Sequence, residues 1–209
     1  MKQLEYSALS TLIDRYEDFW HVTLYSLKYT LRSLKLSFDS HLLQDIAAKY
    51  LDLKPFEDAQ HCLERLAPMP RAILSNGSRA MLNSLAVSSK LDHHFDHVRS
   101  VDAKRAFKPA PQAYALAEEA LGFKHDEVMF ESSHGPDICG AKSFGFTTVE
   151  IQRADTAGTS GSLPEAMVDD RITFNPKTGN RKTRDYVADV PVGSLAAIPD
   201  LFTDDGLAV

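Results

Sequence analysis

Apolar residues in the first fifty positions recur at steps of three and four, the spacing of amphipathic helices. One apolar stripe runs through residues 4–34, and no glycine or proline interrupts the chain before Pro55. Asp39 or Ser40 is the expected cap of a further helix, because short polar side chains satisfy the first backbone N–H groups of a helix. Residues 1–53 are therefore predicted to form a helical unit.

Beyond residue 54 the pattern changes to short apolar runs that alternate with helical segments. Strands that alternate with helices are typical of an α/β layer with a mostly parallel sheet. Right-handed crossovers bring the carboxyl ends of such strands to one edge, where ligands bind. The predicted strands are 71–75, 97–101, 128–130 and 147–151, and the predicted helices are 56–66, a segment from Ala80 onward, 113–121 and 137–144.

The end of the chain is less regular. Residues 154–185 are rich in Thr, Gly, Ser, Asp and Lys, which predicts a loop-rich insertion with one short strand at 171–174. Its basic part, 177–184, is expected to be a solvated loop. A last strand at 187–192 and a last helix at 194–202 are predicted to complete the α/β layer.

Composition then excludes several classes of protein. The 209 residues are 44% hydrophobic and 25% charged, which is usual for a globular domain. Acidic residues exceed basic ones by 29 to 23, so no nucleic-acid partner is expected. The only cysteines, Cys62 and Cys139, lie far apart and predict a reducing compartment, the cytoplasm. No apolar run approaches the roughly 18 residues of a membrane helix, so no membrane partner is expected.

Polar side chains follow three of the predicted strands. Ser75 and Asn76 follow the first strand, Lys108 follows the second, and the third is followed by a polar segment that includes Ser132, His134 and Asp137. Each group taken alone is more often a turn, a helix cap or a solvated side chain. Because all three strand ends share one edge of the sheet, they favour a convergent polar site.

Two other patterns are set aside. Residues 92–97 contain three histidines, but adjacent histidines on a short turn rarely point at one ion, so a solvated turn anchored by Phe95 is favoured and no metal is expected. Ser132, His134 and Asp137 lie within six residues. Their side chains should diverge from one loop, which disfavours a nucleophile–base–acid triad.

Three segments, in this order, resemble the second, third and fourth motifs of the haloacid dehalogenase superfamily. They are Leu-Ser-Asn-Gly-Ser at 74–78, Phe-Lys-Pro-Ala-Pro at 107–111 with Tyr114, and the run from Phe130 to Phe146. Within the superfamily the sequence is most similar to the type II 2-haloacid dehalogenases. Several ordered motifs at family-like spacing make this resemblance specific.

The resemblance covers residues 2–153, resumes near 186–202, and includes the helical cap of that branch near the start of the chain. It implies a Rossmann-like α/β core at 54–209 and an incomplete helical cap at 1–53. In that family an aspartate on the first strand attacks the carbon that bears the halogen, halide leaves, and water hydrolyses the ester.

The resemblance also implies roles for individual residues. Lys108 would hold the nucleophile ionised, because a neighbouring cation lowers the pKa of a carboxyl group. Ser75 and Asn76 would orient the nucleophile and the substrate carboxylate. Ser132 and Asp137 would position the nucleophile, Lys108 and the hydrolytic water.

The surroundings of the site follow from the same resemblance. Tyr114 would support Lys108 from behind, and Leu4 and Phe19 would line an apolar cradle that excludes water. The partner is a small halo-carboxylate, no cofactor or metal is needed, and a homodimer is possible.

Two departures from the family pattern bear on the substrate. His134 stands where the family usually has Asn, and Pro136 stands where an aromatic residue is usual. Both are assigned to the substrate-binding set, where His134 could donate a hydrogen bond and Pro136 would reshape the pocket. Another hydrolase of the superfamily, acting on a different small carboxylate, therefore stays open as an alternative.

A third departure concerns the first motif, Asp-x-Tyr-Gly-Thr on an apolar strand, which no segment of this sequence matches. The chain is expected to begin inside the cap, with the nucleophile and the cap arginine upstream of Met1. The central strand of the sheet would then be missing, which exposes the edges of both neighbours and predicts low stability or recruitment of another segment. A catalytically dead pseudoenzyme, or a fragment with a binding role, is the remaining alternative.

Overall fold

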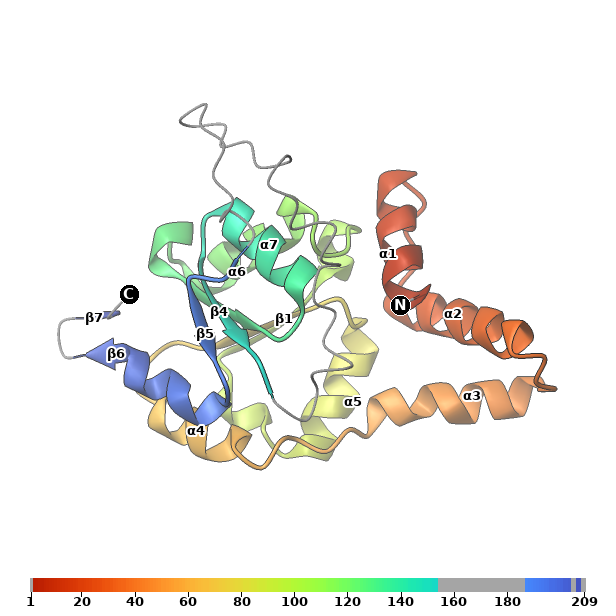
Figure 1. Ribbon diagram of the computed structural model, residues 1–209, viewed down its shortest axis with the longest axis horizontal. Coiled ribbons are helices and arrows are strands. Elements are labelled where there is room, and N and C mark those ends of the chain that lie inside the picture. Colours follow the sequence, from red (N-terminus) through yellow and green to blue (C-terminus); the bar gives the residue numbers. More distant parts are fainter. Residues whose placement is uncertain (1, 154–186, 204–205, 208–209) are drawn as a thin grey trace.

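The computed structural model describes residues 2–153, 187–203 and 206–207. Three helices stand to one side of an α/β body (Figure 1). None of the helices in these ranges is long and apolar enough to cross a membrane. The insertion predicted at 154–185, with its short strand, lies outside the described residues. The three outer helices are α1 (Lys2–Leu12), α2 (Phe19–Ser33) and α3 (Ser40–Ala48).

Polar caps begin two of these helices, and the sequence pattern predicted the one that begins α3. The Asp39 carboxylate accepts the backbone N–H of Leu42 at 2.8 Å, which starts α3. The Asp18 carboxylate accepts the N–H of His21 at 3.0 Å and starts α2 in the same way. The helical prediction for this part of the chain is confirmed, and the cap of α3 is Asp39 rather than Ser40.

The body alternates strands and helices as predicted. Helices α6 and α7 lie on one side of the strands, and α4 and α5 lie on the other (Figure 1). The strands are β1 (Ala72–Ser75), β2 (His97–Ser100), β3 (Met129–Ser132), β4 (Thr147–Ile151) and β5 (Val190–Val192). The α-helices are α4 (Ala59–Arg65), α5 (Arg79–Ser89), α6 (Pro111–Leu121) and α7 (Gly135–Phe144). Short segments complete the body: the 3-10 helices η1 (Lys49–Leu51), η2 (Asp92–His94), η3 (Val101–Lys104), η4 (His125–Glu127) and η7 (Leu195–Leu201), and the strands β6 (Phe202–Thr203) and β7 (Gly206–Leu207).

Two predictions about the body were wrong in part. The last helix is the 3-10 helix η7, because Pro199 inside it cannot donate an α-helical hydrogen bond. The turn that includes η2 is not fully solvated, since His94 is buried and shares the anchoring with half-buried Phe95.

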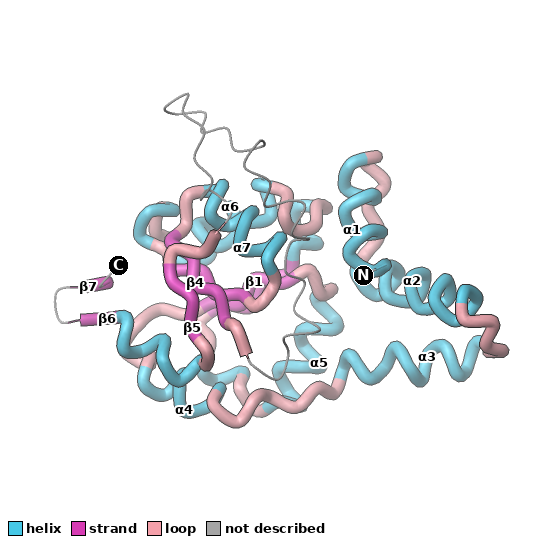
Figure 2. Tube along the Cα trace, viewed as in Figure 1, coloured by secondary structure: helices cyan, strands magenta, loops and turns pink. Residues whose placement is uncertain are grey.

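Strands β1 to β5 form two separate parallel sheets (Figure 2), and β6 pairs with β7 in an antiparallel pair. β1 pairs with β2, and Ser75 lies opposite Ser100 at their carboxyl ends. β3, β4 and β5 form the second sheet, in which Ser132 lies opposite Glu150. Among these strands β1 and β3 are not paired with each other.

Aromatic contacts attach the outer helices to the body. The Tyr16 ring, between α1 and α2, stacks on Phe107 with centroids 4.8 Å apart, and its hydroxyl donates to Asp102 at 2.5 Å. Thr11 Oγ1 accepts the backbone N–H of Phe107 at 3.0 Å. The turn between the first two helices is therefore fixed to the segment that leads into Lys108.

Asp58 joins three separate parts of the body. Its carboxylate receives Arg153 at 2.8 and 3.0 Å, the Ser194 hydroxyl at 2.7 Å and the Leu195 backbone N–H at 2.9 Å. The Arg153 guanidinium is the largest cause that lowers the pKa of Asp58 to about 2. This cluster ties the start of α4 to the carboxyl ends of β4 and β5.

We expect Asp58→Asn to lower the free energy of unfolding by about 1–2 kcal/mol at pH 7, because it removes a shared negative charge. The pKa of Asp58 is about 2 in the folded chain and ordinarily 3.8. The ionised carboxylate therefore stabilises the folded chain fully at pH values above its ordinary pKa. This stabilisation is lost as the pH falls towards 2. Urea denaturation at pH 7, 5 and 3 measures the difference.

The matched control is Asp200→Asn, which removes the exposed partner of Arg65. An exposed pair of this kind contributes less than about 1 kcal/mol. A loss for Asp58→Asn no larger than that of the control would contradict the role of this cluster.

Candidate active site

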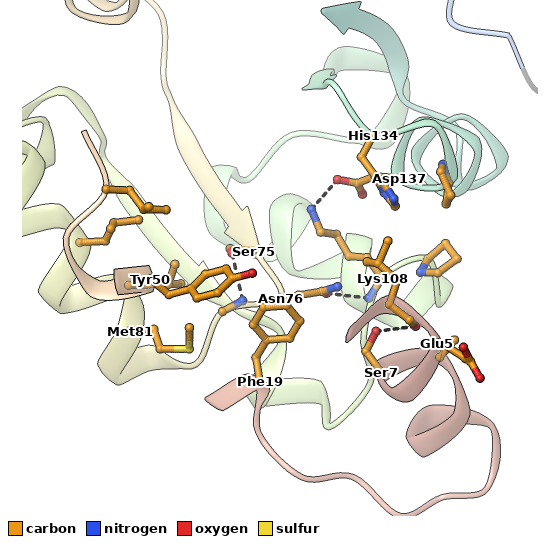
Figure 3. A pocket seen from close by; sticks show the side chains of 18 residues that line it. Glu5, Ser7, Phe19, Tyr50, Ser75, Asn76, Met81, Lys108, His134 and Asp137 are labelled. Atoms are coloured by element: carbon orange, nitrogen blue, oxygen red, sulfur yellow. Dashed lines mark hydrogen bonds and ion pairs between the residues drawn. The ribbon is translucent and has the colours of Figure 1, made fainter. Parts of the chain in front are cut away.

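A cavity of about 610 Å³ opens at the carboxyl ends of β1 and β3. Figure 3 shows the residues that line it, from the outer helices on one side and the body on the other. The structure brings together most of the predicted site residues there. Those that line the cavity are Leu4, Phe19, Ser75, Asn76, Lys108, His134, Pro136 and Asp137.

Lys108 lies between the two sheets. Its Nζ donates to the Leu74 carbonyl of β1 at 3.0 Å and to Asp137 Oδ2 at 2.7 Å. The side chains of Lys108 and Asp137 are each only 12% exposed. The ammonium also lies 5.2 Å from the centre of the Phe130 ring, which favours a cation. Lys108 is thus a held, partly buried cation at the edge of the cavity.

Asp137, in the first turn of α7, is the anchor of that cation. Its Oδ1 accepts the Tyr114 hydroxyl at 2.8 Å, and its Oδ2 accepts the Ser132 hydroxyl at 3.2 Å. Burial first, and then the Asp137 charge, raises the pKa of Tyr114, so this tyrosine stays a donor. Tyr114 supports Lys108 only through Asp137, and neither Tyr114 nor Ser132 is among the residues that line the cavity.

Gly140 lets α7 approach this cluster closely. A Cβ at this position would lie 2.6 Å from Pro109 Cβ, which real side chains do not tolerate, and it would also meet the Tyr114 ring. The missing side chain therefore places Asp137 within reach of both Tyr114 and Lys108.

Asn76 and Ser75 follow β1 at the same edge. Asn76 Oδ1 accepts the backbone N–H of Lys108 at 2.9 Å, so its amide nitrogen is the group that remains to donate to a ligand. Ser75 Oγ accepts the N–H of Gly77 at 3.0 Å, which leaves its hydroxyl proton for another acceptor. Next to Lys108, these two donors suit a carboxylate.

His134 immediately precedes α7 and lines the cavity, and its Nε2 atom makes no hydrogen bond to the described residues. That atom is buried. Burial, and then the nearby Lys108 charge, lowers the pKa of His134, while Asp137 opposes the shift. His134 therefore lines the cavity with a buried ring nitrogen that has no hydrogen-bond partner among the described residues.

The sequence patterns missed part of the site. A wall of apolar side chains, which we call the apolar wall, comes from α5 and from the segment that follows α3. The sequence predicted a helix from Ala80 onward, which supplies the α5 part of this wall. The contact of α5 with η1 joins residues about thirty positions apart, and no local pattern predicts such a contact. The apolar wall consists of Tyr50, Leu53, Met81, Leu82 and Leu85.

Glu131 belongs to the polar segment expected after the third predicted strand, and the structure places it within β3. Burial raises the pKa of Glu131 to about 7, although it does not line the cavity. In the described parts of the chain, no three His, Cys, Asp or Glu side chains are grouped so that they could hold a metal ion.

A family model described as haloacid dehalogenase-like hydrolase matches residues 6–145. This chain belongs to the haloacid dehalogenase-like hydrolases. The resemblance seen in three sequence motifs is thereby confirmed, as is the α/β fold that it implied.

The dehalogenases among its relatives match most of the chain. An (S)-2-haloacid dehalogenase of Xanthobacter autotrophicus is 44% identical over 200 residues, which cover 96% of this chain and 79% of that protein. Haloacetate dehalogenase H-2 of Moraxella sp. (strain B) is 40% identical over 154 residues, 73% of this chain and 69% of that protein.

Solved structures agree with the sequence comparison. The structure of L-2-haloacid dehalogenase from Xanthobacter autotrophicus superimposes with a TM-score of 0.79 at 44% identity. It covers 96% of this chain and 82% of that one. A further structure of that enzyme, with chloropropionic acid covalently bound, matches equally well, with a TM-score of 0.79 at 43% identity.

We expect Asp137→Asn to lower the free energy of unfolding by about 2–3 kcal/mol, because it leaves the Lys108 ammonium buried without a counter-charge. Lys108→Met should cost a similar amount by stranding the carboxylate. The double variant should lose at least about 1 kcal/mol less than the sum of the two single losses. Urea denaturation of all four proteins at pH 7 measures this coupling.

Lys104→Met is the control for removing a lysine, since Lys104 pairs with exposed Glu119. Its effect should stay below about 1 kcal/mol. Strictly additive losses for Lys108 and Asp137 would show that the pair does not hold the site together.

Proposed function

We propose that this chain binds a small 2-halo carboxylate and serves the hydrolysis of its carbon–halogen bond. The observation that carries the proposal is the Lys108–Asp137 pair beside the donors of Ser75 and Asn76, in a cavity whose remaining lining is largely but not wholly apolar. The relatives that match this chain are named for dehalogenation of 2-haloacids and haloacetate.

Each group would act in a defined place. The carboxylate of the acid would accept hydrogen bonds from the Asn76 amide and the Ser75 hydroxyl. Leu4, Phe19 and Pro136 would surround C2 and keep bulk water from it. His134 would offer its free nitrogen to the departing halide or to the hydrolytic water.

The reaction that the resemblance implies needs an ionised carboxylate next to Lys108. Its oxygen would form a bond to C2 while the carbon–halogen bond breaks and the halide leaves with the bonding pair. Water would then add to the ester carbonyl and release a 2-hydroxy acid, with one proton passing to solvent. The Lys108 cation would keep such a nucleophile in its charged form.

One observation favours a second candidate, a chain that binds a small acid without turning it over. In the described ranges, the carboxylate that contacts Lys108 is Asp137, which already accepts bonds from Tyr114 and Ser132. A carboxylate held in this way is a positioning group rather than a free nucleophile.

Binding is tested first by isothermal titration calorimetry with (S)-2-chloropropionate. We expect Asn76→Leu to weaken binding about tenfold, because a hydrogen bond to a charged carboxylate contributes about 1.5 kcal/mol. Asn83→Leu is the matched control, since Asn83 is exposed on α5 and does not line the cavity. Absence of binding to the unsubstituted chain would contradict both candidate functions.

Turnover separates the two candidates. Chloride release is measured with the 209-residue chain and with the same chain preceded by a segment that carries the family's Asp-x-Tyr-Gly-Thr strand. The hydrolase proposal predicts release from the extended chain and its loss in the Lys108→Met variant of that chain. Binding of the acid with no release from a folded extended chain would favour the second candidate.

The substrate alternative raised by His134 and Pro136, another small carboxylate of the same superfamily chemistry, is examined in the same assay. Acids that carry no halogen but bind more tightly than (S)-2-chloropropionate would favour it.

The proposed location is the cytoplasm. Cys62 is buried, and burial raises the pKa of its thiol to about 11, which suits a reducing compartment.

We also propose that a second copy of the chain covers the outer helices. Large apolar side chains are exposed on α1, α2 and α3 and on the segments that connect them, which isolated chains rarely leave uncovered in such number. Sedimentation should give about twice the mass of one chain, and Leu12→Glu, at the most exposed of these positions, should shift it to the single mass. Sedimentation as a single chain at all concentrations would contradict the dimer. The exposed side chains include Leu9, Leu12, Ile13, Tyr25, Leu34, Leu36, Leu42 and Ile46.

A further inference from the structure

The cavity has two ends of opposite character. Lys108 and Asp137 lie at one end, Tyr50 and Met81 lie across the cavity from them, and Asn76 lies between the two groups (Figure 3). The polar end suits the carboxylate and the reacting carbon. The apolar wall, by contrast, has no part in the reaction proposed above.

The elements connect these two ends directly. Helix α5 begins immediately after the polar turn at Asn76, and its first two turns carry Met81, Leu82 and Leu85 away from that turn along the cavity. A ligand whose carboxylate lies at Asn76 therefore has a continuous apolar surface beside its other end.

Part of the apolar wall is left open to solvent. Tyr50 is 42% exposed and Leu53 is 48% exposed, although both line the cavity. Large apolar side chains that face water inside a ligand cavity lower the free energy when an apolar ligand covers them. Their exposure is an observation independent of the size of the cavity.

The size of the cavity also favours a ligand larger than a three-carbon acid. A three-carbon haloacid displaces about as much volume as three or four water molecules, roughly 100 Å³. The cavity holds about 610 Å³, a volume in the range that accommodates much larger ligands. Such a small acid would leave the apolar wall in contact with water.

We propose that this site takes 2-halo carboxylates with an alkyl or aryl tail longer than the methyl group of a propionate. The inference rests on the proposed function and specifies its substrate class. The carboxylate lies at Asn76, C2 lies beside Lys108, and the tail covers Tyr50, Leu53 and Leu85. Each added methylene that reaches the apolar wall should raise the affinity about threefold to fourfold.

The test is a chain-length series on the 209-residue chain. Dissociation constants are measured by calorimetry for the (S)-2-chloro derivatives of propionic, butyric, hexanoic and octanoic acids. We expect the affinity to rise with length and then to level off when the apolar wall is covered. Affinity that stays flat or falls from propionate to octanoate would overturn the inference.

Variants locate the tail. Leu85→Trp fills the space beside α5 and should lower the ratio of octanoate to propionate affinity at least tenfold. Leu53→Ser removes a partly exposed apolar group and should lower the same ratio about threefold. Val87→Trp is the control for a bulky residue on α5, since Val87 is 75% exposed and does not line the cavity.

The outcomes separate this inference from the proposed function. If no acid of the series binds, the proposed function fails, and the inference fails with it. If the propionate binds but length has no effect, the proposed function stands and the inference is wrong. A length effect that both Leu85→Trp and Leu53→Ser leave unchanged would place the tail elsewhere and would also overturn it. Leu53 lies outside the helices and strands, so that variant gives a reading even if Leu85→Trp does not fold.

Discussion

The ion pair of Lys108 and Asp137 connects the two parallel sheets of the body. Lys108 Nζ contacts the Leu74 carbonyl in one sheet and Asp137 beside the other. It therefore joins β1 to the β3 side at a place where the described strands make no backbone pairing. The group expected to serve the chemistry is also one that holds the two halves of the body together.

Such a pair is stable only when the remaining polar atoms around it are satisfied, because removing two charges from water is costly. Tyr114 and Ser132 supply the further hydrogen bonds to Asp137, and Gly140 lets α7 come close enough for them to form. The Lys108 ammonium balances the charge of the Asp137 carboxylate. An anionic ligand at the mouth of the cavity meets donors and a cation rather than a free negative charge.

The outer helices complete this environment from the opposite side. Tyr16 and Thr11 fix them to Phe107, which immediately precedes Lys108 in the chain. Any movement of the first helices relative to the body therefore acts on the backbone beside the cation.

The helices, the strands and the family could be predicted from the amino-acid sequence alone. Local spacing predicted helices over the first fifty residues, a polar cap predicted the start of α3, and polar residues after predicted strands indicated Ser75, Lys108 and Asp137, because these signals depend on neighbours a few residues apart. The contacts between residues that are distant along the chain became visible only in the folded structure. It showed that Tyr114 acts on Asp137, that His134 carries a buried nitrogen without a partner, and that Tyr50 and Leu53 meet α5 to form the apolar wall. These contacts join positions that are distant along the chain, and their geometry is set by how helices and sheets pack, which no local pattern encodes.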